Sequence, residues 1–353
     1  MQLLKTIFKA LSTFWKTEVW ELSGLEFQSK TTCTVIYAGR DVHKNYIANL
    51  IYSGEHSETL LGTYNFWALR RLIHRTKVQY DLVFIEGQNL QQWWYQSASD
   101  FFIPLWLGAK AAIPLKVTNR STKDDTRRMR KYNLDYRLAN TVAEYDHFYH
   151  QMYLSSMAQR HEDRAIIMAY DKMMAEITTN GAQLLLVALE EQAIAGTIIL
   201  KHGSTPTLWS TGILNADPDY WKTGVASASY VFCAQYLAEQ GYKEMDMGLS
   251  RAFLSDGVLQ YKKKWNARFT AVGRSGFIFK INSLREASKG FLQRHPFVHS
   301  RQDAIYGVVC FESDSETEET LAKKGSRYDL SGFNACRFFK FGEGSNRLEE
   351  VNF

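Results

Sequence analysis

The chain has 353 residues, of which 45% are hydrophobic and 22% are charged, and its formal net charge is +5. This length predicts two domains, and the composition is that of a globular protein with a substantial core. The small positive excess suits an anionic ligand and does not by itself indicate nucleic acid. The four cysteines are far apart and form no CxxC pair, which argues against a disulfide framework or a zinc site and favours a reducing cytosol. They are Cys33, Cys233, Cys310 and Cys336.

The first 20 residues place apolar side chains at helical spacing, with lysines between them. The lysines interrupt the apolar run and no small-residue cleavage site follows, so we reject a signal peptide. We expect residues 1–22 to form an amphipathic helix docked on the protein's own core. The alternative is that residues 1–20 lie in the membrane interface, which would make a cytoplasmic protein peripheral to the inner face of the membrane. No apolar run in the chain has the length needed to span a bilayer.

The first half of the chain reads as strands around one helix. Alternating apolar residues predict strands at Thr34–Ala38 and Thr59–Tyr64, and Asp81–Ile85 is a third strand. Asn65 is a candidate N-cap for a helix that follows the second strand. The aromatic residues Trp93, Trp94 and Tyr95 follow. We expect them to belong to the core rather than to stack on a sugar or an adenine.

A break near Pro114–Arg120 separates the halves. After it we expect a basic helix over Thr122–Lys131, a strand at Leu134–Leu138, and helices at Val142–Met157 and Ala165–Thr178, the last ended by Gly181.

The centre of the chain follows this break. Short alternating runs predict antiparallel strands, and a 3-4 spacing then predicts an amphipathic helix that ends before Gly241. The expected strands are Leu184–Leu189, Ala193–Leu200, Leu208–Leu214, Glu244–Met247 and Phe269–Phe279, and the expected helix is Ala226–Gln240. Towards the end of the chain we expect strands at Ile305–Phe311 and Arg337–Lys340 with an acidic helix start between them, to which we assign no function.

Small residues precede the central helix. The first backbone N–H groups of a helix have no partner within it, so small residues there allow an anion to approach closely. The candidate loop consists of Lys222, Thr223, Gly224, Val225, Ala226 and Ser227. An ordinary glycine turn at a helix start is the alternative, and the loop alone decides nothing.

A charged segment follows the helix. Asp246 stands beside Gly248 at a strand end, where a carboxylate can orient a basic group or take a proton. Three successive lysines, residues 262–264, come later, and they point in different directions, so at least one is solvated.

Together these residues resemble the Gcn5-related N-acetyltransferase (GNAT) family, in the branch similar to the Fem peptidoglycan interpeptide-bridge transferases. That branch shows a helix, E-x-G, D-x-G at a strand end, and then S-R followed by G-L-x-x-F-K-x-x-W-G. The chain carries the corresponding residues Glu239-Gln240-Gly241, Asp246-Met247-Gly248, Ser250-Arg251, Gly257-Val258, Tyr261-Lys262 and Trp265-Asn266. The chain departs from this pattern at several positions. Tyr261 replaces the phenylalanine, Asn266 replaces the last glycine, and Leu249 stands where arginine is common. The basic stretch 126–131 also resembles the helix that opens the family's second domain.

The resemblance covers about residues 121–281 and implies a mixed α/β fold with tandem GNAT-like domains. We expect an N-terminal helix (1–22), a degenerate GNAT-like domain (23–120), a better-preserved acyltransferase domain (121–298) and a small α/β extension (299–353).

The resemblance also implies the chemistry. The donor would lie between parted strands with its phosphates on the loop at Gly224, and an amine would attack its carbonyl directly. Lys262 would hold a phosphate or the developing negative charge, and Asp246 and Tyr261 are candidates for the general base, which stays unassigned. We expect substrate contacts from Arg127, Arg128, Arg130, Arg251, Trp265 and His161.

We therefore expect an N-acyltransferase that uses acyl-CoA, needs no metal, and acylates a small-molecule amine such as an amino sugar, an amino acid or a cell-envelope precursor. One alternative uses aminoacyl-tRNA and forms a peptide bond; the modest charge and the absence of a heptad run favour CoA. Another is a non-catalytic, membrane-associated scaffold of an envelope-polymer pathway. His147 and His150 lack a third metal ligand, and Cys233 is expected to be a core residue rather than a nucleophile. The sequence leaves the oligomeric state open.

Overall fold

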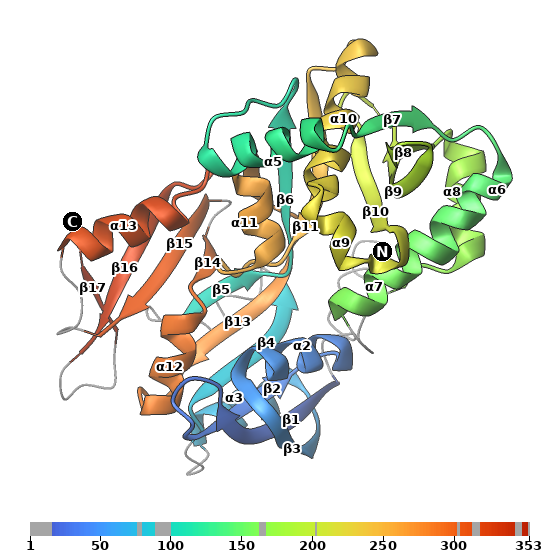
Figure 1. Ribbon diagram of the computed structural model, residues 1–353. Helices are drawn as coiled ribbons and strands as arrows, with labels where there is room; N and C mark the ends of the chain where they lie inside the picture. The colour runs from blue at the N-terminus through green and yellow to red at the C-terminus, as the bar shows by residue number, and fades with distance from the viewer. Residues whose placement is uncertain are drawn as a thin grey trace, which may run out of the picture. The chain divides into compact units, whose positions relative to one another are not determined.

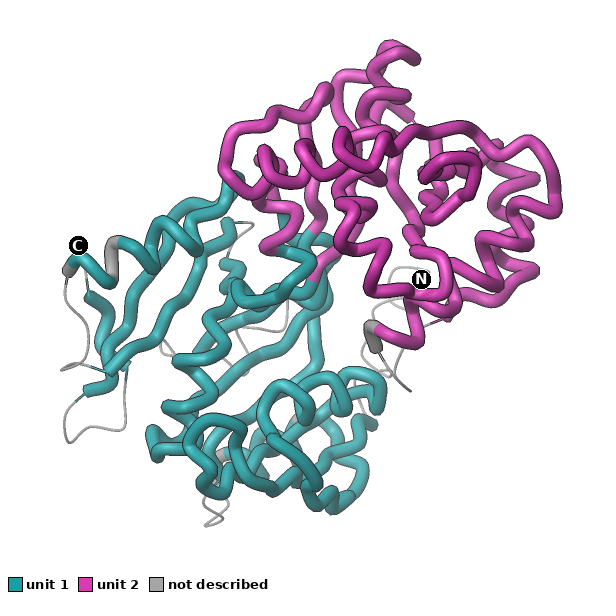
Figure 2. The backbone as a smooth tube through the Cα atoms, in the orientation of Figure 1, with its two compact units in different colours: residues 1–107, 251–259, 270–353 teal, residues 108–250, 260–269 magenta. Residues whose placement is uncertain are grey.

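The computed structural model describes residues 16–75, 80–88, 100–161, 167–201, 203–301, 304–312, 318–342 and 348–351. The chain forms two compact units (Figure 2). Unit 1 holds residues 1–107, 251–259 and 270–353, and unit 2 holds residues 108–250 and 260–269. These units differ from the four contiguous segments expected from the sequence, because residues 251–259 and 270–298 belong to the same unit as the N-terminal half. The expected aromatic cluster at residues 93–95 lies outside the described residues.

Unit 1 is built on a six-stranded sheet of order β3-β1-β2-β4-β13-β5 (Figure 1). Its strands are β1 (Thr17–Glu26), β2 (Thr32–Ala38), β3 (Tyr52–Tyr64), β4 (Leu82–Gln88), β5 (Phe101–Pro104) and β13 (Ser275–Ile281). Strand β2 lies parallel to β4, and β1 pairs antiparallel with both β2 and β3. The helix expected over residues 1–22 is wrong from Thr17 onward, since this part is a strand whose pairing with β2 and β3 decides its conformation; residues 1–15 lie outside the described part.

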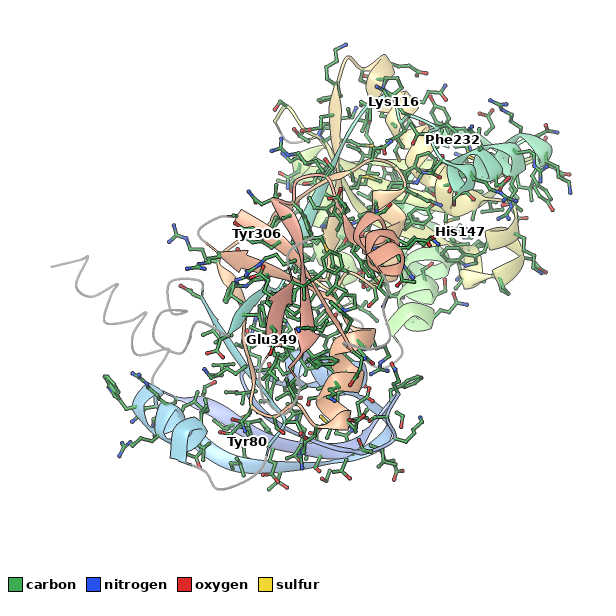
Figure 3. All side chains as sticks on the ribbon, turned by 90° about the vertical axis from the view of Figure 1, so that its left-hand side faces the viewer. Tyr80, Lys116, His147, Phe232, Tyr306 and Glu349 are labelled. Carbon is green, nitrogen blue, oxygen red and sulfur yellow. The ribbon has the colours of Figure 1, made fainter. Side chains whose placement is uncertain are left out.

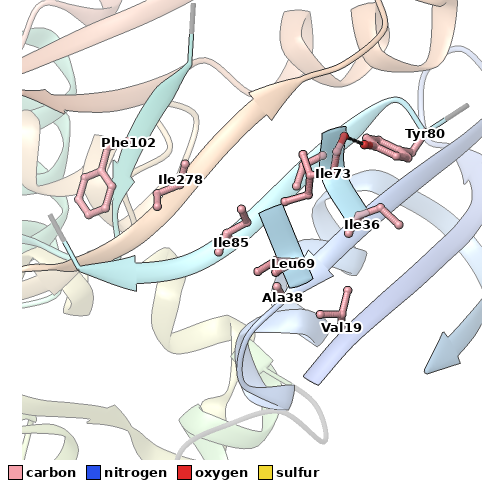
Figure 4. Packing of buried hydrophobic residues seen from close by; sticks show 10 residues of the cluster. Val19, Ile36, Ala38, Leu69, Ile73, Tyr80, Ile85, Phe102 and Ile278 are labelled. Atoms are coloured by element: carbon pink, nitrogen blue, oxygen red, sulfur yellow. Dashed lines mark hydrogen bonds between the residues drawn. The ribbon is translucent and has the colours of Figure 1, made fainter. Parts of the chain in front are cut away.

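Each face of this sheet packs against helices. Helix α3 (Phe66–Arg75) begins as expected, with the Ala68 amide donating to Oδ1 of Asn65 at 2.9 Å. Its Leu69 and Ile73 pack on the side chains that point to one face of the sheet (Figure 4). Those sheet residues are Val19, Ile36, Ala38, Val83, Ile85 and Ile278, with Phe102 of β5 and Tyr80, whose hydroxyl donates to the carbonyl of Ile73. On the other face Phe84 stacks on Phe279 with ring centroids 4.6 Å apart.

Two further helices belong to unit 1 beside the sheet, α2 (Asp41–Ile51) and α12 (Glu286–Arg294). Helix α12 places Phe291 edge-on to Phe84, with centroids 6.1 Å apart. A second sheet of order β14-β15-β16-β17 completes unit 1 together with helix α13 (Glu318–Tyr328). Its strands are β14 (Phe297–Arg301), β15 (Ala304–Phe311), β16 (Ala335–Phe341) and β17 (Leu348–Val351). The expected strands and helix of the C-terminal part are confirmed.

Two buried histidines make unit 1 sensitive to acid. Nδ1 of His299 accepts the amide of Phe102 at 2.9 Å, and burial lowers the pKa of His299 and of His295 to about 4. The unfolded chain binds protons near pH 6.5, where the folded chain does not, so stability falls as the pH drops below 6.5. We expect a loss of about 2 kcal/mol per histidine by pH 5.

Urea unfolding between pH 7 and pH 5 tests this expectation, since Glu86, whose pKa is about 2, stays ionised there. The variant His299→Gln should show a smaller loss than the wild type over this range. An equal loss in both proteins would assign the acid sensitivity to other groups.

Unit 2 holds one seven-stranded sheet of order β12-β6-β11-β10-β9-β8-β7. Its strands are β6 (Leu107–Ala112), β7 (Asp135–Leu138), β8 (Gln183–Leu189), β9 (Gln192–Leu200), β10 (Thr207–Ile213), β11 (Glu244–Ser250) and β12 (Arg268–Ala271). Strands β7, β8, β9 and β10 form an antiparallel meander, as the alternating runs predict. The expected single strand at Phe269–Phe279 is wrong: Gly273, at φ 72°, lies between β12 and β13, which belong to different sheets.

The helices of unit 2 include α5 (Arg120–Lys131), α8 (Tyr170–Asn180), α9 (Pro218–Lys222), α10 (Val225–Glu239) and most of α11 (Gly257–Lys263). Between α5 and α8 the chain forms α6 (Val142–His147), a π-helix (Phe148–Tyr153) and α7 (Leu154–His161), where we expected one α-helix. Gly181 ends α8 in the left-handed conformation at φ 61°, as expected. No helix among the described residues is long and apolar enough to cross a membrane.

Helix α10 packs on the sheet through the stripe that the 3-4 spacing predicts. All residues of the predicted stripe are buried, namely Val225, Ser229, Phe232, Cys233, Tyr236 and Leu237, and Ser227, Ala228 and Ala234 are buried beside them. Phe232 lies against Tyr136 of β7, with ring centroids 5.2 Å apart, and is labelled in Figure 3. Burial raises the pKa of the Cys233 thiol, which agrees with a core role.

Candidate active site

Strands β10 and β11 lie next to each other in the sheet of unit 2, and they pair over one register only. Thr207 is the Cα partner of Asp246, and the Asp246 amide donates to the carbonyl of Pro206 at 2.8 Å. Both strands then continue to Ile213 and Ser250, without further pairing to each other. The two parallel strands therefore part towards their C-terminal ends, and their facing backbone groups are left for another partner.

The conformation of each parted strand is irregular near the point of divergence. The pairing of β10 with β9 shifts between Leu208 and Ser210, which leaves Trp209 in a β-bulge. In β11 Gly248 has φ 79°, and its amide donates to Oδ1 of Asp246 at 2.7 Å. A Cβ at Gly248 would lie 3.3 Å from the carbonyl oxygen of Leu208, so glycine suits both the backbone angle and the space. Asp246 thus stabilises the turn in β11.

Lys262 holds the end of β11. Its side chain is 2% exposed, and Nζ donates to the carbonyls of Gly248 at 2.9 Å and of Leu249 at 2.8 Å. The ammonium is therefore next to the parted strand and not at the start of α10. Its charge is partly compensated by the two carbonyl dipoles, which is the usual requirement for a buried cation.

The first turn of α10 is covered by α5. Gly224 begins the helix at φ 87°, and a Cβ built there would lie 3.2 Å from the carbonyl oxygen of Asp125 and 3.3 Å from Cβ of Arg128. Val225 has no exposed surface. Lys222 points to solvent, where it pairs with Asp219 at 2.5 Å. The expectation that a carrier's phosphates lie directly on these amides therefore finds no support in the geometry.

A polar network joins α5, α10 and α11 at this place. The Ser227 hydroxyl donates to Oδ2 of Asp125 at 2.6 Å, and Nζ of Lys264 donates to the same oxygen at 2.6 Å. The hydroxyls of Tyr261 and Ser227 are 2.6 Å apart, and the Lys264 ammonium lies 3.7 Å from the centre of the Tyr261 ring. Burial raises the pKa of Tyr261, so its phenol stays protonated near neutral pH and is unsuited to act as a base.

Removing the Ser227 hydroxyl tests how much this network stabilises. The variant Ser227→Ala loses both hydrogen bonds and leaves Asp125 with one partner fewer, so we expect unfolding free energy to fall by about 1–2 kcal/mol. Urea unfolding measures the change. Ser121→Ala, at an exposed serine of α5, is the matched control; equal midpoints for the two variants would contradict a structural role of the network.

Basic side chains cover the outer face of α5. Arg127, Arg128 and Arg130 are exposed, and the helix is capped by Asn119, whose side chain accepts the Thr122 amide at 2.9 Å. Because Arg128 packs on Gly224, this positive surface lies over the start of α10.

The remaining residues that the sequence predicted for substrate binding are Trp265, Arg251 and His161, and they lie in different places. Trp265 is 1% exposed and belongs to the core of unit 2 rather than to a binding surface. Arg251 belongs to unit 1, where its guanidinium lies between the rings of Tyr46 and Trp106. His161 ends α7, and its side chain is outside the described ones. Among the described residues no group of three histidine, cysteine or acidic side chains could hold a metal ion.

Sequence reasoning missed Asp125 and Lys264. Asp125 lies in a basic stretch and has no signal of its own in the sequence. Lys264 stands three residues after Tyr261, a spacing that would have placed both side chains on one helical face. An apolar groove elsewhere in unit 2 lies along the later part of α10, between Val231 and Glu239, and Pro114 and Leu115 also line it. It lacks the strand ends and the cations described above.

Comparison with known proteins identifies one domain of the chain. Residues 118–263 match the family model described as an acetyltransferase (GNAT) domain. The search of curated proteins finds no match.

Similar solved structures include FemX, with 12% sequence identity over 70% of this chain and 81% of that chain and a TM-score of 0.36. L-PGS from Bacillus licheniformis has 10% identity over 73% of this chain and 80% of that chain, with a TM-score of 0.36. A GCN5-related N-acetyltransferase from Sphaerobacter thermophilus has 9% identity over 70% of this chain and 72% of that chain, with a TM-score of 0.34. At these TM-scores the likeness supports no argument, so the assignment rests on the family model. Residues 118–263 match a GNAT acetyltransferase domain, and this match supports acyl transfer as the activity of that part of the chain.

Proposed function

We propose that unit 2 transfers an acyl group from a phosphate-bearing carrier, with acyl-CoA preferred, to a primary amine by direct attack. The observation that carries the proposal is the single register that joins β10 to β11. Beyond Thr207 and Asp246 the strands part, and the unpaired backbone groups on their facing edges can hydrogen-bond an extended, amide-containing carrier arm as an additional strand would.

The chemistry needs few side chains. The neutral amine attacks the thioester carbonyl, the new C–N bond forms, the C–S bond breaks, and the leaving thiolate takes up a proton while the amine nitrogen loses one. Unpaired amides of the parted strands can stabilise the oxyanion, and positioning supplies much of the remaining acceleration. Lys262 serves this reaction by holding the end of β11 through the carbonyls of Gly248 and Leu249.

The phosphates of the carrier must bind elsewhere, because α5 covers the backbone amides at the start of α10. Arg127, Arg128 and Arg130 are exposed on α5, directly over that first turn. Arginine binds phosphate oxygens through two parallel N–H donors, so this surface suits the diphosphate of a CoA molecule.

A second candidate donor is aminoacyl-tRNA, which would make the product a peptide bond. The exposed basic residues of α5 favour it, since a polyanion binds to rows of arginine and lysine with strong salt dependence. Those residues are Arg120, Lys123, Arg127, Arg128, Arg130 and Lys131.

Turnover and binding assays test these proposals. Thiol release from a panel of acyl-CoAs, with amino sugars and amino acids as acceptors, should proceed in the wild type. Arg128→Gln should raise KM for acyl-CoA at least tenfold, whereas Arg268→Gln, at an exposed arginine of β12, should leave it unchanged. No heat with CoA but a salt-sensitive gel shift with charged tRNA would assign the second donor. Failure of every donor–amine pair would support a non-catalytic scaffold and overturn the proposal.

A further inference from the structure

Unit 1 carries a charged cluster where the parallel strands β2 and β4 end. The carboxyl ends of adjacent parallel strands meet at one edge of a sheet, which is a common place for ligands. Glu86, near the end of β4, accepts the Arg40 amide at 3.1 Å, Nε of Arg40 at 2.6 Å and the Nδ1 hydrogen of His43 at 3.0 Å. The Tyr37 hydroxyl, from β2, donates to the Arg40 carbonyl at 3.0 Å. Helix α2 starts beside these strand ends (Figure 1).

Glu86 determines the tautomer of His43. Burial opposes the charge of Glu86, but hydrogen bonds from His43 and Arg40 outweigh it and lower the pKa of the carboxyl to about 2. Nδ1 of His43 therefore donates to an ionised carboxylate, and in this tautomer Nε2 presents a lone pair. The proton on Nδ1 excludes a hydrogen bond from Nη2 of Arg40, which lies 3.4 Å from Nδ1, so the contact with Glu86 decides the tautomer. The ring also packs edge-on against Phe277, with centroids 5.9 Å apart, so it is held in one orientation.

Arg251 has a guanidinium nitrogen without a hydrogen-bond partner among the described residues. The carbon atom of its guanidinium lies 4.2 Å from the centre of the Tyr46 ring and 4.0 Å from the centre of the Trp106 ring. Nη1 is buried and has no hydrogen-bond partner among the described residues, and no ion pair of that part of the chain involves Arg251. Asp256 lies near enough to favour the charge without a hydrogen bond to it. A buried guanidinium nitrogen without a hydrogen-bond partner needs an explanation, and a bound anion supplies one.

The histidine and the arginine belong to one constellation. His43 and Tyr46 are three residues apart on α2, so both side chains lie on the same face of the helix. Tyr46 stacks on Arg251, and the Tyr37 hydroxyl is near both Glu86 and the Arg251 charge. All of these residues are in unit 1.

We propose that this constellation binds a small carboxylate whose neighbouring N–H or O–H group donates to Nε2 of His43. The carboxylate pairs with the stacked guanidinium, whose planar edge matches two oxygens in line. An N-acylated amino acid, a hydroxy acid and the last residue of a peptide all have this chemistry. Binding of such a ligand is measured without an acyl donor, so the test does not depend on acyl transfer.

Nuclear magnetic resonance titration of the full-length protein with four probes tests the proposal. N-acetylglycine carries both groups, N-acetylglycinamide lacks the carboxylate, propionate lacks the N–H donor, and inorganic phosphate is the other anion. N-acetylglycine should bind the wild type at least tenfold more tightly than the other three. Arg251→Met should lose this binding, and Arg251→Lys should lose most of it because an ammonium does not stack as a plane. Arg274→Met, at an exposed arginine of unit 1, is the matched control and should bind as the wild type does.

Several outcomes would overturn the proposal. Equal binding of N-acetylglycine to the wild type and to Arg251→Met places the carboxylate elsewhere. Preference for phosphate rejects the carboxylate assignment. Thermal melting guards against a folding defect, since removal of an unpartnered guanidinium should leave the melting temperature equal or higher. A much lower melting temperature for Arg251→Met, with no probe bound by the wild type, would make Arg251 a structural residue only.

Discussion

Replacing Gly212 with alanine is expected to destabilise unit 2 by about 3 kcal/mol. A Cβ at this position of β10 would lie 2.5 Å from the Met152 carbonyl oxygen and 2.6 Å from the Tyr153 amide nitrogen. Both atoms are backbone, and they belong to the π-helix Phe148–Tyr153, so no side chain can rotate to make room. The π-helix would have to move off the sheet, and the core around Phe148 and Met152 would open.

Urea unfolding followed by circular dichroism measures this effect. Gly257→Ala is the matched control, because a Cβ there meets nothing within 4 Å and the backbone angle is ordinary. The control should be neutral or slightly stabilising. Equal stability of the two variants would show that β10 and the π-helix are less tightly packed than the structure describes.

Replacing Lys262 with methionine is expected to lower acyl transfer at least 100-fold, which corresponds to about 2.7 kcal/mol of barrier. Methionine has a similar length and fills the space, but it has no ammonium group. The carbonyls of Gly248 and Leu249 therefore lose the hydrogen bonds that Nζ of Lys262 donates to them. Two buried acceptors without a donor also reduce the unfolding free energy by about 2–3 kcal/mol. The end of β11 then loses the position that the parted strands require.

Rates and stability are measured on the same preparations. Lys172→Met, at an exposed lysine of α8, is the control for loss of one charge and should behave as the wild type. Full activity of a folded Lys262→Met protein would contradict the role of this lysine. The unfolding curve gives the fraction of Lys262→Met that is folded. Activity per folded molecule then separates an effect on acyl transfer from an effect on stability.

Local sequence patterns predicted the central part of unit 2 closely. The strands from Leu184 to Ile213 are short, largely apolar runs separated by polar turns, and the helix that starts at Val225 has a 3-4 stripe that the structure buries. Caps and stops were equally informative, since Asn65 begins α3 and Gly181 ends α8. These features depend on neighbours in sequence, so periodicity and capping reveal them.

Features that depend on distant segments were missed. Strand β13 pairs with β4 although the paired residues Ser275 and Gln88 are far apart in sequence, and β6 of the first half lies in the sheet of unit 2. Nothing local distinguishes such strands from those that pair with neighbours. The packing of α5 on Gly224, and the network around Asp125, likewise arise from tertiary contact. For that reason the sequence predicted an open amide cradle where the structure has a covered one.

Hydrogen–deuterium exchange on adding a donor tests the central claim most directly. The account predicts that an acyl-CoA, or the charged tRNA if that is the donor, protects amides of Leu208–Ile213 in β10 and Met247–Ser250 in β11. The outer strand β7 (Asp135–Leu138) should exchange as before. Protection confined to other segments, while the protein turns the donor over, would place acyl transfer outside the parted strands and contradict the account.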